Sequence, residues 1–213
     1  MKSFSPIHES KSAIRIRPAH PYDASFEVAA LLYDTDPYIY PYWFGGNRDL
    51  GLQTLSGLFT TPGNIFYYEN IIIAEDISER KIVGVLCHLE HDTPLDFDYR
   101  QISTTTGTEK VYTEYFDWLK SEAQAASPST LIVSNLCTDS NRRGHGIGRK
   151  LFGAFVDQAD RQGYDRIEFD CLADNAAAIH LYESFGCKII RHGKGFGGDR
   201  PAPDVVDFVR TRP

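Results

Sequence analysis

The segment Asn141-Arg-Arg-Gly-His-Gly-Ile-Gly-Arg-Lys150 decides how this chain folds. It places three glycines within five residues, and four basic side chains, between a run typical of a strand and an amphipathic helix. Glycines let a backbone turn tightly and leave its N–H groups uncovered, and a helix N-terminus favours an anion. In a chain of formal net charge −7, this local basic cluster predicts a ligand that carries phosphate.

The glycine spacing distinguishes between kinds of phosphate-binding loop. A P-loop ends in Gly-Lys followed by Ser or Thr, whereas Gly148 is followed by Arg149 and Lys150. The dinucleotide fingerprint needs GxGxxG, whereas this loop reads GxGxG and lies late in the chain. Taken alone, the loop also fits a structural glycine turn before a helix, so a second signal is needed.

The hydrophobic pattern around this loop predicts an α/β domain built on a mixed sheet. Strands are expected over 13–17, 71–74, 82–89, 131–138, 167–172, 188–191 and 205–210. Helices are expected over 21–33, 49–59, 111–126, 147–162 and 175–185. The first of these helices carries Phe26, Ala29, Ala30 and Tyr33 at helical spacing. Residues 36–45 are expected to form a loop rich in aromatic side chains.

Composition limits the classes of function. A length of 213 residues suits one domain, and a net charge of −7 argues against a general nucleic-acid or membrane binder. Four cysteines without a CxxC spacing suggest neither a zinc site nor a redox pair, and buried, reduced thiols are expected. The polar first residues lack the apolar core of a signal peptide, and no apolar run could span a membrane. A cytoplasmic protein without a metal is therefore expected.

A second and a third motif give the loop its context. Arg143-Gly-His-Gly-Ile-Gly148 matches the (Q/R)xxGx(G/A) signature of the GNAT acyltransferases, and Leu136-Cys-Thr138 stands where that family has Leu-x-Val. Asn175-Ala-Ala-Ala-Ile-His-Leu-Tyr-Glu-Ser-Phe-Gly186 resembles the family's Asn-x-x-Ala-Ile-x-Leu-Tyr-x-x-x-Gly helix. The chain departs from the family at Ser140, where proline is common, and at Cys187, which replaces an aromatic residue.

This resemblance implies the GNAT fold, an α/β fold with a mixed central β-sheet, a splayed strand pair and flanking helices. It is firm over 131–191, looser over 13–90 and not evident in the segment 91–129. All 213 residues are then expected to form a single acetyltransferase domain. Within it, 1–12 would be a loose tail, 91–129 an inserted segment with a helix, and 131–191 the acetyl-CoA-binding core.

The resemblance also implies roles in binding acetyl-CoA as a cosubstrate. The backbone of Leu136, Cys137 and Thr138 would hold the pantetheine arm like an added strand, and N–H groups near Thr138 would stabilise an oxyanion. Asn175 would bond to the same arm, although a helix N-cap is an alternative role for it. The pyrophosphate would lie on the loop residues Arg143, Gly144, His145, Gly146, Ile147, Gly148 and Arg149.

Tyr182 matches the position of the family's general acid, which would protonate the leaving thiolate; a core tyrosine is the alternative. No motif identifies a general base. Four carboxylates flank strand ends and are candidates, although the pattern favours a solvated surface charge for each taken alone: Glu69, Glu90, Asp92 and Asp139.

The aromatic loop is the expected acceptor site. Carboxylates beside aromatic faces suit a cationic amine, although packing of these rings against the sheet is an equal alternative. The residues expected to bind the acceptor are Asp34, Asp36, Tyr38 and Tyr40. The helix over 111–126 could cover this site or form a dimer contact.

The leading hypothesis is transfer of an acetyl group from acetyl-CoA to a primary amine of a small molecule, by direct attack in a ternary complex. The alternatives are acetylation of a protein lysine or N-terminus, and a non-catalytic sensor of acyl-CoA. The expected partner is a small-molecule amine, with no nucleic acid and no membrane. A homodimer is left open.

Overall fold

The computed structural model describes residues 14–98, 109–196 and 201–212, and within the helix at 109–125 it describes the side chains of 113–121. The tail expected over 1–12 therefore lies outside the described residues, as do Gly197 and Gly198.

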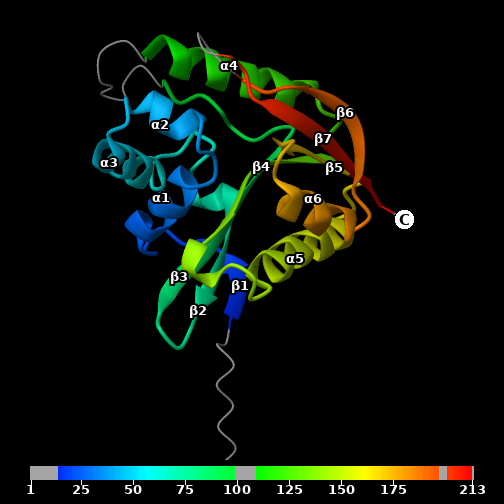
Figure 1. Ribbon diagram of the computed structural model, residues 1–213, viewed down its shortest axis with the longest axis horizontal. Helices are drawn as coiled ribbons and strands as arrows, with labels where there is room; N and C mark the ends of the chain where they lie inside the picture. Colours follow the sequence, from blue (N-terminus) through cyan, green and yellow to red (C-terminus); the bar gives the residue numbers. More distant parts are fainter. Residues whose placement is uncertain (1–13, 99–108, 197–200, 213) are drawn as a thin grey trace, which may run out of the picture.

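Within the described residues, seven strands form one sheet in the order β1-β2-β3-β4-β5-β7-β6 (Figure 1). Neighbouring strands are antiparallel except for β4 and β5, which run parallel. The strands are β1 (Ile14–Pro18), β2 (Ile71–Asp76), β3 (Lys81–Glu90), β4 (Thr130–Thr138), β5 (Arg166–Leu172), β6 (Lys188–Lys194) and β7 (Asp204–Thr211). The expected mixed α/β architecture is confirmed.

Helices cover both faces of the sheet. In Figure 1, α1, α2 and α3 lie on one side of it, α5 and α6 lie on the other, and α4 crosses near β6 and β7. The helices are α1 (Ser25–Tyr33), α2 (Ile39–Trp43), α3 (Arg48–Leu58), α4 (Glu109–Ala125), α5 (Ile147–Gln162) and α6 (Ala176–Glu183).

The two faces of the sheet belong to two separate hydrophobic clusters. Ile71 and Ile73 of β2 pack in the cluster under α1 to α4, whereas Ile72 and Ala74 pack in the cluster under α5 and α6. Successive residues of a strand point to opposite faces, so a strand buried on both faces reads as a continuous apolar run. This explains the sequence Ile71-Ile-Ile-Ala74.

Local signals fix α5 at the bounds expected from the sequence. Its buried face repeats at helical spacing, with Ile147, Leu151 and Phe155 among its members. Gly146 at its N-cap and Gly163 at its C-cap both adopt left-handed backbone conformations, with φ of 76° and 88°. Glycine adopts these angles without the steric cost that a Cβ would add.

The expected loop over residues 36–45 is wrong, because a short helix, α2, forms inside it. Asp36 Oδ1 accepts hydrogen bonds from the backbone N–H groups of Tyr38 (2.6 Å) and Ile39 (2.9 Å) and so starts the helix. Tyr40 and Trp43 are then buried, at 3% and 0% exposure.

The expected start of the first helix also needs correction. α1 begins at Ser25 rather than at Pro21, and Phe26 is 58% exposed. The helix buries the face that carries Val28 and Leu32, and Phe26 lies outside that face.

Two glycines of α3 offer a matched pair of substitutions. A Cβ added at Gly51 would lie 2.5 Å from Tyr33 Cε2 and 2.9 Å from Phe44 Cδ2, whereas one added at Gly57 would meet no atom within 4 Å. Alanine favours a helix over glycine by up to about 1 kcal/mol, but overfilling a packed core costs about 1–3 kcal/mol. We expect Gly57→Ala to raise the free energy of unfolding and Gly51→Ala to lower it by about 1–2 kcal/mol. Urea unfolding followed by circular dichroism measures both, and equal effects would contradict the packing of α3.

Candidate active site

The parallel strands β4 and β5 separate soon after they meet. Their register joins Thr130 to Arg166, Leu131 to Ile167 and Ile132 to Glu168, and no pair follows within the described residues. From residue 133 onward, the edge of β4 that faces β5 therefore carries backbone N–H and C=O groups without a strand partner. This is the splayed strand pair expected from the sequence.

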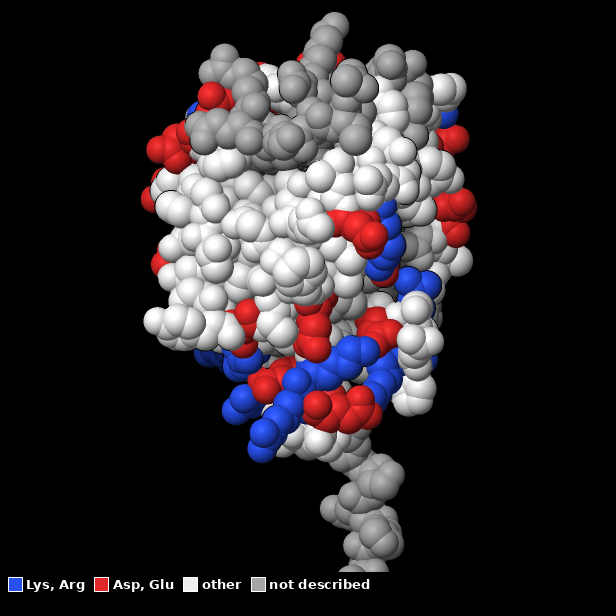
Figure 2. All heavy atoms as spheres, turned by 90° about the vertical axis from the view of Figure 1, so that its left-hand side faces the viewer, with Lys and Arg blue, Asp and Glu red and all other residues white. Residues whose placement is uncertain are grey.

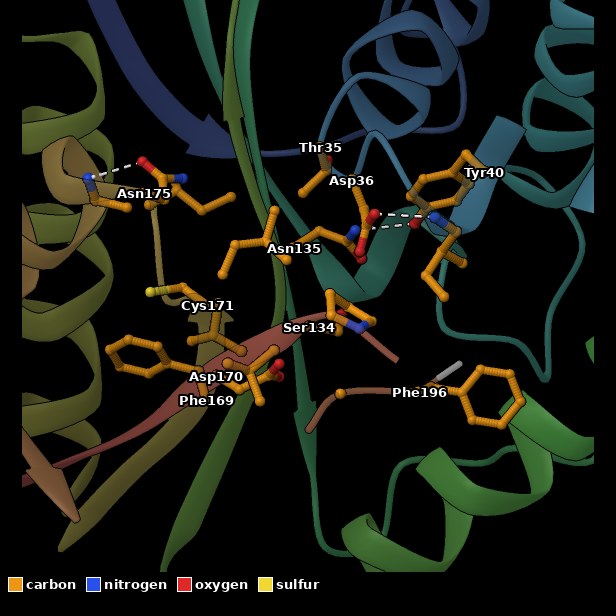
Figure 3. A pocket seen from close by; sticks show the side chains of 18 of the residues that line it. Thr35, Asp36, Tyr40, Ser134, Asn135, Phe169, Asp170, Cys171, Asn175 and Phe196 are labelled. Carbon is orange, nitrogen blue, oxygen red and sulfur yellow. Dashed lines mark hydrogen bonds between the residues drawn. The ribbon is translucent and has the colours of Figure 1, made fainter. Parts of the chain in front are cut away.

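A cavity of about 140 Å³ lies at this separation. Figure 3 shows it with Asp36 and Tyr40 on one side of β4, and Asn175 and Cys171 on the other. Of the residues expected to form the site, the cavity brings together Asp36, Tyr40, Leu136, Asn175 and Tyr182. Helix α4 and the segment between β6 and β7 complete the lining, through Tyr115, Trp118, Gly195, Phe196 and Pro203.

Tyr182 is 6% exposed and lines the cavity from α6. Its ring packs against Phe152, Phe169 and Phe208, with centroids 5.1, 4.5 and 5.5 Å away. Its hydroxyl makes no hydrogen bond to another described residue. Burial, reinforced by the neighbouring Cys171, Cys187 and Asp170, raises the pKa of Tyr182 above its usual value, so the phenol keeps its proton at neutral pH. The ring therefore belongs to the core, and the hydroxyl carries a proton at neutral pH.

Asn175 is the N-cap of α6, where its Oδ1 accepts a hydrogen bond from the N–H of Ala178 at 3.2 Å. The same side chain lines the cavity, and Figure 3 shows it at the cavity wall with this bond. Its amide nitrogen makes no hydrogen bond to the described protein. It can cap the helix and still donate to a ligand.

Asp170 is a site residue that sequence reasoning missed. It lies on β5 and lines the cavity, directly across the ladder from Asp207 of β7. Arg191 neutralises Asp207 through an ion pair of 2.5 Å, whereas no described cation pairs with Asp170. The side chain of Asp170 is exposed toward the cavity. Desolvation by the surrounding protein is the larger cause, and repulsion from Asp207 the second, that together raise the pKa of Asp170 to about 6. The available signal was an acidic residue inside an apolar strand, between Phe169 and Cys171.

Asn135 is a second residue that the sequence did not single out. It lies on the separated part of β4, and its Nδ2 donates to Tyr40 Oη at 2.9 Å. The bond is buried and joins α2 to β4. Tyr40 thereby anchors α2 beside the cavity.

Two of the expected acceptor residues do not line this cavity. Asp34 pairs with Arg48, with Oδ2 3.1 Å from Nη2, and faces a separate hollow beside Arg143. Tyr38 is 44% exposed. Asp34 is the C-cap of α1, and Tyr38 is the N-cap of α2.

None of the four carboxylates first considered as the general base lines the cavity, which is a correction to the expectation from strand ends. Asp139 forms an ion pair of 2.9 Å with Lys81. The four flank strand ends elsewhere in the sheet, whereas Asp170 lies inside a strand. Its position within the splayed strand pair places Asp170 in the cavity.

The glycine loop between β4 and α5 is open on its outer side. Gly144 and Gly146 have φ of 79° and 76°, and a Cβ added at either would meet no atom within 4 Å. The backbone N–H groups of residues 144–149 make no hydrogen bond within the described protein. Free N–H groups in an open glycine turn at a helix N-terminus fit a pyrophosphate.

The basic side chains of this loop have different roles. Arg142 binds the buried Asp76 (3.1 Å) and also Glu79, which ties the loop to the β2–β3 turn. His145 Nδ1–H donates to the carbonyl of Arg143 at 2.9 Å and braces the turn. Arg143, Arg149 and Lys150 form no ion pair with described residues and remain available to a phosphate.

Figure 2 views the face that carries α1 to α3. Basic and acidic side chains interleave at the end of this face near β2 and β3, where Arg15 pairs with Glu75 and Arg17 with Asp23. No helix in the described part of the chain is long and apolar enough to cross a membrane. Among the same residues, no group of three or more His, Cys, Asp or Glu side chains is placed to hold a metal ion.

Comparisons with known proteins agree with this geometry. A mycothiol acetyltransferase from Brachybacterium faecium is 30% identical over 74 residues, which is 35% of this chain and 22% of the relative. N-alpha-acetyltransferase 30 from Saccharomyces cerevisiae is 37% identical over 54 residues, which is 25% of this chain and 31% of the relative. The chain thus spans less than a third of the length of each of these curated relatives.

The fold resembles solved acetyltransferases over almost its whole length. An N-acetyltransferase from Staphylococcus aureus Mu50 superposes with a TM-score of 0.69 at 18% identity, covering 92% of this chain and all of the other. The model of the Acetyltransferase (GNAT) family matches residues 66–187, more than half of the chain. The chain belongs to the Acetyltransferase (GNAT) family.

Proposed function

We propose that this protein transfers an acetyl group from acetyl-CoA to a primary amine of a small molecule, by direct attack in a ternary complex. One observation supports this most directly: a single cavity joins the open edge of β4, the Tyr182 hydroxyl and the Asp170 carboxylate. The relatives leave the acceptor open, since one is named for mycothiol and another for N-alpha-acetylation. α4 and Phe196 narrow the cavity, which favours a small acceptor over a protein.

We assign the binding of acetyl-CoA to the open backbone groups of the glycine loop and of β4. The N–H groups of 144–149 and the side chains of Arg143 and Arg149 would bind its pyrophosphate. The open edge of β4 from Leu136 to Thr138 would pair with its pantetheine arm, and the Asn175 amide would donate to that arm. When bound there, acetyl-CoA supplies a thioester carbonyl that an amine can attack.

Asp170 would prepare the amine. An alkylamine with a pKa of about 10.4 is protonated at neutral pH, and freeing its lone pair there costs about 4 kcal/mol. Asp170 is largely ionised at neutral pH and has no cation partner among the described residues, so it can both attract the ammonium group and accept its proton. Its elevated pKa makes it a stronger base than an ordinary aspartate.

Two further groups complete the proposed chemistry. N–H groups on the free edge of β4 can donate hydrogen bonds to a carbonyl oxygen that gains negative charge, each worth about 3 kcal/mol in comparable sites. Tyr182 holds a proton at Oη that it can give to a leaving thiolate. The chain would thus carry a base and an acid in one cavity, one on β5 and the other on α6.

The proposal includes a cytoplasmic location. Cys87, Cys137, Cys171 and Cys187 are all free thiols, as is usual in reducing compartments. Burial raises the pKa of Cys137 to about 11 and that of Cys171 to about 12, so neither is a ready nucleophile.

Binding of acetyl-CoA should depend on the glycine loop. Gly146→Asp adds a side chain and a negative charge where the pyrophosphate would lie, so it should remove the thermal stabilisation by acetyl-CoA. Gly46→Asp is the matched control, because Gly46 has a similar φ of 77° and equally open surroundings away from the loop. Thermal shift with acetyl-CoA, ATP and NADH measures the effect. Stabilisation by ATP or NADH alone would contradict the assignment of the ligand.

A screen of small amines, amino acids, aminoglycosides, polyamines and peptides for release of free CoA tests the reaction itself. We expect turnover of small amines.

The variant Tyr182→Phe removes the proposed proton donor. Its kcat should fall by about 100-fold or more, with the affinity for acetyl-CoA little changed. Tyr164→Phe is the control, because it removes a phenol oxygen that bonds Glu90 outside the cavity. Turnover of peptides alone would favour a protein acetyltransferase. Binding of acetyl-CoA without any turnover would favour a sensor.

The activity should depend on the ionisation of Asp170. kcat/KM for the amine should fall as the pH drops through about 6, because protonation removes the base. Asp170→Asn should lower kcat/KM by about 100-fold or more and abolish this limb of the pH profile. Asp207→Asn should shift the limb to lower pH, since it removes the repulsion that raises the pKa of Asp170. An Asp170→Asn enzyme with full activity would assign proton removal to another group or to water.

A further inference from the structure

A second cavity, of about 150 Å³, adjoins the first. It extends between α4 and the strands β6 and β7, away from Asn175 and Tyr182. The two cavities share wall residues from α4, β4, β5 and the β6–β7 region: Tyr115, Trp118, Val133, Ser134, Phe169, Asp170, Gly195 and Val205. A molecule with an amine at Asp170 would therefore have its remaining atoms next to this second space.

The charges around the second cavity are largely neutralised. Glu168 accepts a hydrogen bond of 2.8 Å from Arg166, and Lys194 forms an ion pair of 2.7 Å with Asp204. Asp207 and Arg191 neutralise each other, as described above. Asp170, on the shared wall, is the one charged lining residue without an ion-pair partner among the described residues. The second cavity thus offers no free charge of its own to a ligand beyond the carboxylate that meets the amine.

Apart from Ser134 and Gly195, the remaining lining residues are apolar or aromatic. Leu119, Ile132 and Phe208 line the cavity, and Ile190 lies at its rim with 58% exposure. Such apolar surface favours an apolar group that displaces water from it.

Three aromatic rings meet where the two cavities adjoin. Tyr115 lies 5.8 Å from Trp118 and 5.4 Å from Phe196 between ring centroids, and Trp118 lies 6.4 Å from Phe196. Trp118 remains 41% exposed, although large apolar side chains are more stable when covered.

We propose that the second cavity binds an apolar, aromatic group of the acceptor, so that the protein selects primary amines that carry an aryl body. This rests on the proposed function and specifies its substrate class. The carboxylate of Asp170 would bind the ammonium end, and Trp118 with Ile190 would cover the aryl end. α4 contributes Tyr115, Trp118 and Leu119 to this wall.

Steady-state kinetics with paired amines tests the proposal. kcat/KM for 2-phenylethylamine should exceed that for propylamine by about 10-fold or more, since burial of an aryl group is worth about that factor. Trp118→Ala should remove most of this preference by lowering kcat/KM for the aryl amine more than kcat/KM for propylamine, whereas Trp118→Phe should retain it. Tyr22→Ala is the matched control, because Tyr22 is a 90% exposed aromatic residue that lines neither cavity.

Tryptophan fluorescence provides a readout that does not require turnover. The chain has two tryptophans; Trp43 is fully buried, and Trp118 is partly exposed at the cavity. Binding of 2-phenylethylamine, with CoA present, should shift the emission to shorter wavelength as Trp118 loses water, and Trp118→Phe should abolish the shift. Propylamine should give little change.

The outcomes separate the two proposals. Equal turnover of both amines, unaffected by Trp118→Ala, would overturn the aryl selectivity and leave the acetyltransferase proposal intact. A higher kcat/KM for a peptide with an N-terminal phenylalanine than for 2-phenylethylamine would assign the second cavity to a peptide and also overturn the selectivity proposed here. No acetylation of any amine by a protein that binds acetyl-CoA would overturn the proposed function, and this inference with it.

Discussion

The separation of β4 from β5 is the constraint on which the rest of the structure depends. The two strands share three residue pairs and then part, which leaves backbone N–H and C=O groups facing a gap. A buried polar group without a partner costs about 1–3 kcal/mol, so such a gap must remain wet or receive a polar ligand. Each strand is instead held on its outer side, β4 by β3 and β5 by β7, with seven register pairs in each case. The sheet is rigid on both sides of an opening that its own hydrogen bonds cannot close.

Everything near the opening comes from segments that are distant in the sequence. α6 brings Asn175 and Tyr182 to one side, and the start of α2 brings Asp36 to the other. The buried bond between Asn135 and Tyr40 links the middle of β4 to α2. α4 and the segment between β6 and β7 then narrow the space to a cavity. The order of the strands in the sheet, rather than any single motif, makes these residues neighbours.

The sequence predicts what local rules determine. The bounds of α5 follow from its apolar spacing and its two glycine caps, and most strands follow from their apolar runs. Its family motifs single out Tyr182 and Asn175, which line the same cavity, and the glycine loop, which does not line it. The sequence signals Asp170 only as an acidic residue inside an apolar strand, because the environment of this carboxylate depends on the register that places Asp207 opposite it. The prediction of a loop over residues 36–45 is wrong for a similar reason. The hydrogen bonds that Asp36 accepts help to start a short helix, and the direction of that helix decides which side chains face inward.

The facing carboxylates of Asp170 and Asp207 have a consequence for the evolution of this protein. Like charges directly across a ladder destabilise a sheet, and only one member of this pair has a counter-ion among the described residues. A neutral residue at position 170 would relieve that repulsion, so selection for thermal stability alone would remove the aspartate. Keeping the aspartate would lower the free energy of unfolding in exchange for the proposed reactivity of Asp170. A bound ammonium ion would offset the repulsion between the two carboxylates while it remained in the cavity. Thermostabilised descendants of this chain that lose activity should therefore be examined first at this strand pair.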